Sequence, residues 1–367
     1  MMAADPKPLL SICIPTYNRA KFLRVMLQAL LPQVADCGSE VEVWVLNNAS
    51  TDDTLQILEE SRGLGAFRIK NQAVNIGPTR NIVDGPQTCA QGEYTWILGD
   101  HNLLRPNGLQ CVLDRLKKNQ SFDVHYVNYR AANYPDQWPV DALEGFDGPF
   151  SYIGNPEVQD GPISHWYELL RPISAACTQN YVHIVRTRIW RDFWQNIKIS
   201  SDYTSALTTY PHTMTLIETQ LKSPTMVLSV PCFTIFNGAQ SWGQPATRIK
   251  VYFKGLSELL HSLENKNLPE SVLKQLWMDF FYPESAKVVY EAFTKLGCFQ
   301  GTAVVIQHLG FRKRNWFAFI KGFLRYLFPY LYRKTTETTN YRFYYRGWYI
   351  YNCRPVRWLR RLTERSR

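Results

Sequence analysis

The chain has 367 residues, enough for two or three domains, and its 45% hydrophobic and 20% charged residues are typical of a globular protein and not of a disordered one. Its net charge of +10 is uneven, because residues 310–367 carry 15 Lys and Arg against 2 acids. No charge-free apolar run reaches the roughly 18 residues of a spanning helix. Eight scattered cysteines without a C-x-x-C pair, and no basic stretch followed by an apolar one at the N-terminus, predict reduced thiols in the cytoplasm.

The first 130 residues alternate between strand-like and helix-like segments. Apolar runs predict strands at 9–14, 41–46, 67–70, 94–98 and 124–129. Helical spacing and start signals predict helices over 22–32, after a capping box of Ser50 and Asp53, from Pro78 towards Gly92, and over 108–118. This alternation predicts an α/β domain with a mostly parallel sheet that helices cover on both faces.

The rest of the chain changes character twice. Residues 131–175 are rich in Pro, Gly, Asp and aromatic side chains and predict a long functional loop, followed by strands at 182–185 and 226–230. The spacing becomes helical from Val251 onward. We therefore predict three parts: an α/β domain over 1–244, a helical extension over 245–310, and a basic, aromatic tail over 311–367.

Polar residues follow three of the predicted strands at the point where each ends. They are Tyr17-Asn18-Arg19, Asn47-Asn48 and Asp100-His101-Asn102. In parallel sheets ligands bind beyond the carboxyl ends of the strands, so these clusters predict a site. Neither G-x-G-x-x-G nor G-x-x-x-x-G-K-[ST] is present, which argues against a dinucleotide cofactor and a P-loop.

Four segments in order resemble family 2 glycosyltransferases with the GT-A fold. They are Ser11 to Arg19, Asn47 to Thr54, Asn75-Ile76-Gly77 with Arg80-Asn81, and Gly92 to Asn102. Within this family, the four segments resemble the bacterial abequosyltransferase-like enzymes of surface-polysaccharide synthesis. The resemblance covers residues 8–120, extends loosely over 175–240, and implies a GT-A domain that is followed by the helical, basic and aromatic C-terminal region.

The resemblance implies that the first three segments bind a nucleotide-sugar donor. The matching positions are Pro15, Thr16, Tyr17, Asn18, Arg19, Asn48, Ser50, Asn75, Gly77, Arg80 and Asn81, together with Asp100 and His101. An Asn amide can pair with a pyrimidine edge, and the Arg80 guanidinium can pair with the donor phosphates. The alternative for Ser50, Asp52 and Asp53 is that they only cap a helix.

The fourth segment matches the D-x-D-type metal site of the family but keeps a single carboxylate. Asp100, His101 and Asn102 are the candidate ligands for Mg²⁺ or Mn²⁺, and Asp100 also counts as catalytic. These ions prefer oxygen ligands, so we expect weaker binding than in related proteins or a larger part for Arg80. The alternative is a polar turn without a metal.

Inversion at an anomeric carbon requires a base that takes the proton of the acceptor hydroxyl. In the family this is usually an Asp or Glu after the later strands, and that position falls near His212. An imidazole with a pKa near 6.5 is a competent base, so His212 is the candidate base; a third metal ligand or a structural histidine are the alternatives. The alternative carboxylates for this role are Asp160, Glu168, Asp202 and Glu218.

The basic tail has a second pattern. Trp316, Phe319, Ile320, Phe323, Leu327 and Leu331 keep helical spacing, and Lys321 and Arg325 share another face. This suits a helix lying in a membrane interface, and the alternative is a helix packed on the core. An acceptor that is linked to a polyprenyl carrier would give peripheral contact with the inner face of the plasma membrane a purpose.

The sequence and its resemblance therefore predict a glycosyltransferase that moves a sugar, with inversion, from a nucleotide-sugar donor to a saccharide or lipid-linked saccharide in bacterial surface-polysaccharide synthesis. No nucleic-acid partner is expected. Two alternatives stay open: a sugar nucleotidyltransferase on a related sheet, and a non-catalytic basic protein that binds membranes or RNA on a decayed GT-A scaffold.

Overall fold

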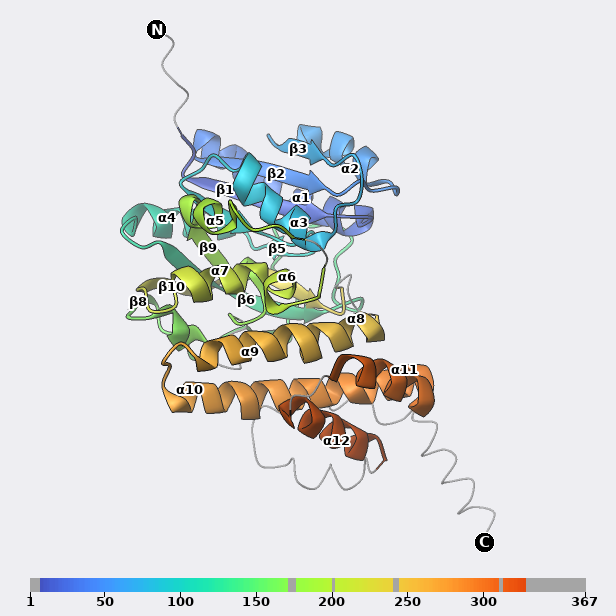
Figure 1. The fold of residues 1–367 in the computed structure, drawn as a ribbon. Helices are drawn as coiled ribbons and strands as arrows, with labels where there is room; N and C mark the ends of the chain where they lie inside the picture. Colours follow the sequence, from blue (N-terminus) through green and yellow to red (C-terminus); the bar gives the residue numbers. More distant parts are fainter. Residues whose placement is uncertain (1–6, 171–175, 200–201, 240–243, 310–312, 328–367) are drawn as a thin grey trace. The chain divides into compact units, whose positions relative to one another are not determined.

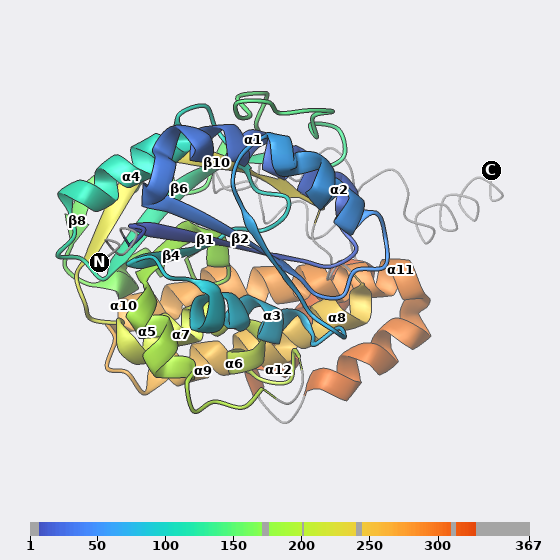
Figure 2. The ribbon, with the colours of Figure 1, turned by 90° about the horizontal axis from the view of Figure 1, so that it is seen from above.

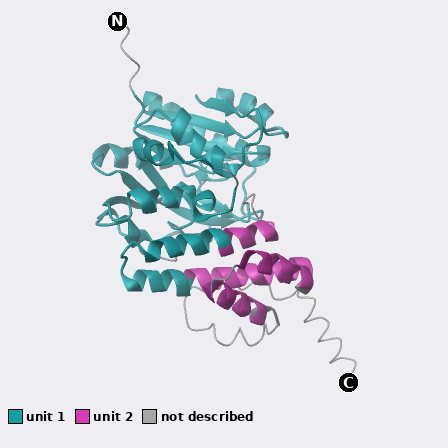
Figure 3. Cartoon of the chain, viewed as in Figure 1, with its two compact units in different colours: residues 1–243, 254–279 teal, residues 244–253, 280–367 magenta. Residues whose placement is uncertain are grey.

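The structure is a computed structural model that describes residues 7–170, 176–199, 202–239, 244–309 and 313–327. The chain groups into two compact units, coloured separately in Figure 3: unit 1 is 1–243 with 254–279, and unit 2 is 244–253 with 280–367. The predicted domain limits at 244 and 310 stay predictions. Most of the predicted tail, residues 328–367, lies outside the described residues.

The strands of unit 1 form one sheet (Figure 1). They are β1 (Leu10–Thr16), β2 (Val41–Asn47), β3 (Arg68–Asn71), β4 (Tyr94–Ile97), β5 (Leu103–Leu104), β6 (Val124–Asn133), β7 (Tyr152–Ile153), β8 (Gly161–Ile163), β9 (His183–Arg186) and β10 (Thr225–Asn237). The order is β3-β2-β1-β4-β9-β6-β10-β5, with β7 on β6 and β8 on β10. The long pairings are parallel, while β5, β7, β8 and β9 pair antiparallel over two or three residues.

Helices cover both faces of this sheet, as Figure 2 shows. The helices of unit 1 are α1 (Ala20–Cys37), α2 (Thr54–Glu60), α3 (Pro78–Asp84), α4 (Gly108–Lys118), α5 (Thr187–Trp194), α6 (Ala206–Thr209), α7 (Pro211–Thr219), α9 (Ser257–Glu264) and α10 (Glu270–Gln275). α1, α2 and α4 lie on one face and α3, α5 and α7 on the other. Side chains on both faces of β1 and β4 are therefore buried, among them Ile12, Cys13 and Trp96. The predicted α/β class is confirmed.

The predicted end of the first helix at Pro32 is wrong, because α1 continues to Cys37. Proline removes one helical hydrogen bond, but the residues beyond it, including Val34 and Cys37, are buried against the domain. The Gln33 side chain also donates to the carbonyl of Arg105, 3.0 Å away, and ties this turn to a distant loop. Tertiary packing outweighs the local signal here.

The predicted capping box of Ser50 and Asp53 does not form either. The Asp52 carboxylate accepts the backbone N–H of Thr54 at 3.1 Å and that of Ala20 at 3.0 Å, so one side chain holds the starts of α2 and α1 together. Ser50 instead accepts the N–H of Asn18 at 2.9 Å. The capping alternative for Asp52 is thus correct, while Ser50 joins two turns of the predicted site.

Unit 2 is helical, with α8 (Pro245–Ile249), α11 (Tyr282–Leu309) and α12 (Lys313–Leu327). An ion pair between Arg248 and Glu291 joins α8 to α11. α12 packs closely on α11 at Gly322, where a Cβ would lie 2.6 Å from the Val289 Cβ. α11 has a kink at Gly297, whose φ of 81° favours glycine.

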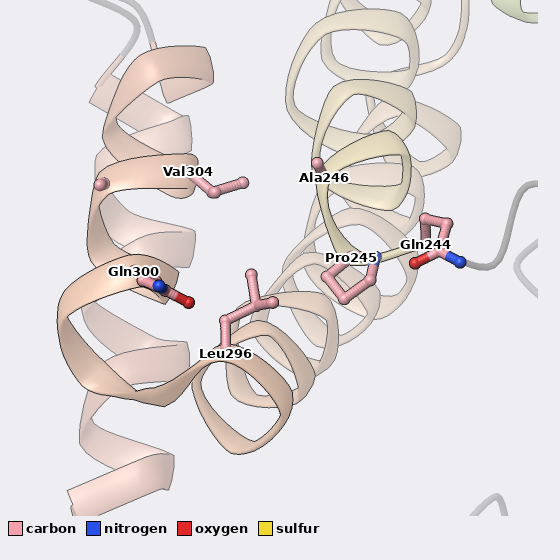
Figure 4. Close-up of a pocket in the computed structure, with 7 residues that line it drawn as sticks. Gln244, Pro245, Ala246, Leu296, Gln300 and Val304 are labelled. Carbon is pink, nitrogen blue, oxygen red and sulfur yellow. The ribbon is translucent and has the colours of Figure 1, made fainter.

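A cavity of about 380 Å³ lies between α8 and α11 (Figure 4). Its lining is mostly apolar and includes Pro245, Leu296 and Val304, with Gln244 and Gln300 beside them. Across the described ranges, no helix has both the length and the apolar character that crossing a bilayer requires.

The core of unit 1 contains histidines that are uncharged at neutral pH. His125 is 1% exposed and packs edge-on against the Tyr94 ring, 5.2 Å between centroids. Burial lowers the pKa of His125 to about 4. Since an unfolded histidine titrates near 6.5, the unfolded chain gains protons below that pH before the folded chain does. Acid therefore destabilises the fold from about pH 6.5 downward.

Between pH 7 and pH 5, we expect the free energy of unfolding of His125→Phe to fall by about 2 kcal/mol less than that of the wild type. The reason is that a phenyl ring fills the site without titrating. Urea unfolding at the two pH values measures the difference. His165→Phe is the matched control, since the His165 ring is only partly buried. An equal fall in the free energy of unfolding of His125→Phe and of the wild type between the two pH values would contradict this account.

Candidate active site

Three polar turns meet at one edge of the sheet. β1 and β2 run parallel with Thr16 opposite Asn47, and the Asn48 amide donates to the Thr16 carbonyl at 3.0 Å. β4 lies on the other side of β1, and the Leu98 amide donates to the Cys13 carbonyl at 3.0 Å. The carboxyl ends of the three strands are therefore neighbours, and the clusters predicted after them lie at this edge.

Asp100 joins the turn after β1 to the turn after β4. Its Oδ2 accepts a hydrogen bond from the Thr16 hydroxyl at 3.0 Å. Its Oδ1 accepts from Arg19 Nε at 3.2 Å and pairs with His101 Nδ1 at 3.0 Å. Because an ionised carboxylate only accepts, Nδ1 of His101 carries the proton.

The Asp100 carboxyl is ionised at neutral pH although the residue is only 6% exposed. Burial by itself raises its pKa, but the hydrogen bond from His101, the charge of Arg19 and the hydroxyl of Thr16 outweigh burial and lower the pKa below its usual value. Buried charge at this edge is thus stabilised by three neighbours from two turns.

Arg19 has donors that this pairing does not use. Its guanidinium carbon lies 3.8 Å from the centroid of the Phe22 ring, and its side chain is only 12% exposed. Nη2 is buried and has no hydrogen-bond partner among the residues that the structure describes. A desolvated donor without an acceptor is costly, so this nitrogen is set up to bind an acceptor.

Asn102 is a second buried side chain with an unused donor, and this side chain is neutral. It is fully buried, and its Oδ1 accepts the Gly99 amide at 2.6 Å. Only the oxygen of the side-chain amide can accept from N–H, so this bond determines which way the amide points. Its Nδ2 is buried and has no partner within the described ranges. The Asn102 side chain therefore offers an unused donor, while its oxygen already accepts the Gly99 amide.

The turns after β1 and β2 are joined directly. Asn18 has a φ of 51°, donates through its backbone to Ser50 Oγ at 2.9 Å, and accepts the Thr51 amide through Oδ1 at 2.7 Å. Tyr17 beside it is 41% exposed, and Pro15 is partly buried. The structure thus brings these predicted residues together and leaves the Tyr17 ring accessible.

Asn48 connects this pair to the third segment. It is 2% exposed; its Nδ2 donates to Asn75 Oδ1 at 2.9 Å and its Oδ1 accepts the Ile76 amide at 2.9 Å. Gly77 follows with a φ of 88°. Both polar ends of the Asn48 amide are used within the protein, so it shapes the edge.

Asp202 closes the third segment from a loop 123 residues further along the chain. Its Oδ1 accepts the Thr79 amide at 3.0 Å, and a Cβ on Gly77 would lie 2.1 Å from its Oδ2. Glycine at 77 is therefore required both by φ and by space. Sequence reasoning named Asp202 only as one alternative carboxylate, and no local pattern signals a contact over this separation.

Arg80 and Asn81 contact backbone carbonyls. Arg80 Nε donates to the carbonyl of Ile199 at 2.8 Å, and Nη2 contacts the same oxygen. Asn81 is buried, and its Nδ2 donates to the carbonyl of Leu46 at 2.8 Å. Asn81 thus supports the end of β2, and the phosphate role of Arg80 stays a prediction.

His212 is 6% exposed, at the start of α7. Burial lowers its pKa to about 3, so its imidazole is neutral and weakly basic at pH 7. The competent base assumed for His212 needs a pKa near 6.5, which this burial removes. Among the alternatives, Asp160 pairs with Arg115, Glu218 pairs with Lys266, and Glu168 accepts the His165 amide. Asp202 contacts the third segment through the Thr79 amide, which places it at the edge.

The predicted metal ligands do not fit a divalent cation as they are arranged. Asp100 already pairs with the Arg19 cation, the Asn102 oxygen is occupied by Gly99, and His101 has one remaining nitrogen. No group of three or more His, Cys, Asp or Glu that suits a metal occurs in the portion of the chain that the structure describes. Hard cations need several oxygen ligands, whereas the buried side-chain atoms of Arg19 and Asn102 that lack partners among the described residues are N–H donors.

Comparison with known proteins supports the predicted fold and resemblance. Unit 1 has the helix-covered, mostly parallel sheet that the GT-A resemblance implies. The family model described as glycosyl transferase family 2 matches residues 11–166, which is less than half of the chain. The predicted resemblance to this family is confirmed.

Relatives of known function match part of the chain. The chain is 35% identical over 103 residues to abequosyltransferase RfbV of Salmonella typhimurium, which is 28% of this chain and 30% of that protein. It is 30% identical over 125 residues to the chondroitin synthase of Escherichia coli, 34% of this chain and 17% of that protein. The chain spans less than a third of the length of these relatives.

The fold also matches a solved structure over most of its length. The structure of Staphylococcus aureus TarS 1–349 in complex with UDP-GlcNAc has a TM-score of 0.53 and 17% identity, and the match covers 89% of this chain and 92% of that one. The likeness shows a common fold.

Proposed function

We propose that this chain is a glycosyltransferase that takes a sugar from a nucleotide-sugar donor and transfers it to a saccharide acceptor in bacterial surface-polysaccharide synthesis. The observation that carries the proposal is the hydrogen-bonded edge, where Thr16, Arg19 and Asp100 join two turns and Asn18, Asn48 and Asn75 join the rest. The glycosyl transferase family 2 model matches residues 11–166, which contain this edge, and relatives named for sugar transfer match part of the chain. The TarS structure with a bound nucleotide sugar supports the donor class.

The site residues divide by chemistry. The exposed Tyr17 ring is suited to stack on a nucleobase, and the unused donors of Arg19 and Asn102 are suited to phosphate oxygens. Asn18, Ser50, Asn48 and Gly77 determine the shape of the turns. The divalent cation predicted from the sequence has no part in this proposal, because its ligands are already engaged.

Transfer with inversion is a direct displacement: the acceptor hydroxyl attacks the anomeric carbon, the nucleoside diphosphate leaves, and a base takes the hydroxyl proton. We assign the base to Asp202 and not to His212. Asp202 is ionisable, partly exposed and in contact with the third segment, whereas His212 is buried and hardly basic.

The acceptor side of the proposal includes a membrane surface. Trp316, Phe317, Ile320 and Leu324 are 41–53% exposed and recur at helical spacing along α12. The same helix carries Lys and Arg residues and no acid. Aromatic and basic residues on one exposed helix suit an anionic lipid interface and an acceptor that is linked to a polyprenyl carrier at the inner face of the plasma membrane.

The function is tested with a panel of UDP-, GDP-, CDP- and dTDP-sugars, with the release of nucleoside diphosphate as the measurement. We expect turnover of one donor class, raised by a saccharide acceptor. Binding of polynucleotide without turnover of any donor would contradict the proposal and favour the basic binding protein; synthesis of a nucleotide sugar from a sugar phosphate and a nucleoside triphosphate would favour the nucleotidyltransferase.

Asp202→Asn is expected to lower kcat by about 10²- to 10⁴-fold, with little change in donor KM, because general-base catalysis has that size. His212→Gln is the matched variant and should keep kcat within about threefold where it folds normally. Rates are measured with the donor that the panel identifies. The reverse ranking of the two variants would restore His212 as the base.

Phe317→Gln with Ile320→Gln is expected to weaken binding to vesicles that contain phosphatidylglycerol by about tenfold or more, since each side chain loses its apolar burial in the interface. Co-sedimentation at low and high salt measures this. Val140→Gln, at a residue that is 93% exposed in unit 1, is the control. Unchanged co-sedimentation of the double variant would remove α12 from the membrane contact.

A further inference from the structure

We infer that this chain binds the diphosphate of its donor through the Arg19 guanidinium and the Asn102 amide, without a divalent cation. The inference rests on the proposed function, because it concerns the donor phosphates. It departs from the D-x-D-type metal site that the family resemblance implies for residues 100–102.

The Asp100 carboxylate has little acceptor capacity left for a cation. Of its roughly four lone-pair positions, Oδ1 uses two for Arg19 and His101, and Oδ2 uses one for Thr16. Arg19 Nε, 3.2 Å from Oδ1, is also a positive charge at the place where a second positive charge would have to bind. Like charges at this separation repel, and the buried edge screens them poorly.

The groups left unsatisfied in the turns after β1 and β4 are donors. Among the described residues, Arg19 Nη2 and Asn102 Nδ2 are buried and have no hydrogen-bond partner. A metal site leaves acceptors to be satisfied, whereas an anion site leaves donors. The Gly99 amide excludes the flipped Asn102, because a side-chain nitrogen facing that N–H would leave two donors opposed.

The Arg19 guanidinium is also held in position before any ligand binds. The Arg19 guanidinium is held on one side by Asp100 and on its face by Phe22, 3.8 Å from the ring centroid. A fixed, desolvated guanidinium forms short charge-assisted hydrogen bonds to phosphate, often in pairs. It therefore supplies positive charge to the leaving diphosphate, and the Arg19 side chain needs little further ordering when the diphosphate binds.

The test is calorimetry of UDP, GDP, CDP and dTDP binding to the full chain, in EDTA and again in Mn²⁺ or Mg²⁺. We expect the nucleotide that binds to have a Kd that differs by less than about threefold between the two conditions. Binding that appears only with the cation, or tightens more than about tenfold with it, overturns this inference and leaves the proposed function standing. Failure of every nucleotide under both conditions overturns both.

Variants separate the two charge sources. Arg19→Gln is expected to weaken nucleotide binding about 10- to 100-fold in EDTA, since it removes charge-assisted hydrogen bonds. Arg24→Gln, on the helix that directly follows Arg19, is the matched control, because the Arg24 side chain is 49% exposed and pairs with Glu60. An unchanged Kd in Arg19→Gln would overturn the inference.

Asn102→Asp provides a second test if Arg19→Gln does not fold. The new carboxylate keeps an oxygen for Gly99 but replaces a donor by a negative charge. We expect about tenfold weaker binding in EDTA, recovered in Mn²⁺. An unaltered Kd in EDTA would contradict us.

The Mn²⁺ spin resonance spectrum gives a readout without nucleotide. We expect the protein to leave the free Mn²⁺ signal unchanged. A loss of signal that Asp100→Asn abolishes would overturn the inference.

Discussion

The buried charge of Asp100 is the constraint on which this site depends. A carboxylate that is 6% exposed must be compensated inside the protein, because desolvation of an unpaired charge is far more costly than any single contact. Thr16, Arg19 and His101 provide the compensation, and they come from both turns that Asp100 joins. The charge therefore has a structural role, because it holds the end of β4 against the turn after β1. A ligand at this edge must contact the place where the two meet.

Around this pair, short polar side chains replace the glycine-rich turns that many nucleotide-binding sheets use. Asn18, Asn48 and Asn75 each bond a neighbouring turn at 2.7–2.9 Å, so the loops are braced against one another. The parallel arrangement of β1, β2 and β4 makes this possible, since it brings three loop starts to one edge. The Asp52 carboxylate likewise joins the starts of α1 and α2 by accepting a backbone amide from each.

The sequence predicts those parts of the molecule that depend on local pattern. Buried strands appear as apolar runs and their ends as polar clusters, so the sheet and its functional edge were predictable. Features that depend on distant contacts were not. Pro32 reads as a helix end, but packing beyond it and the bond from Gln33 to Arg105 carry α1 to Cys37. His212 reads as a titratable base, but burial lowers its pKa to about 3.

The pairing of Arg19 with Asp100 lies between these two cases. Both residues stand at predicted strand ends, yet 81 residues separate them, and only the sheet order shows that they meet. Two carboxylates with a divalent cation sum to zero charge, and so does one carboxylate with one guanidinium. The two arrangements thus leave an edge of the same net charge and differ in what they present to a ligand: open coordination positions in the first, oriented N–H donors in the second. With Asn at position 102 in place of a carboxylate, a bound cation would leave this edge with excess positive charge, and the guanidinium is the partner that balances a single Asp100.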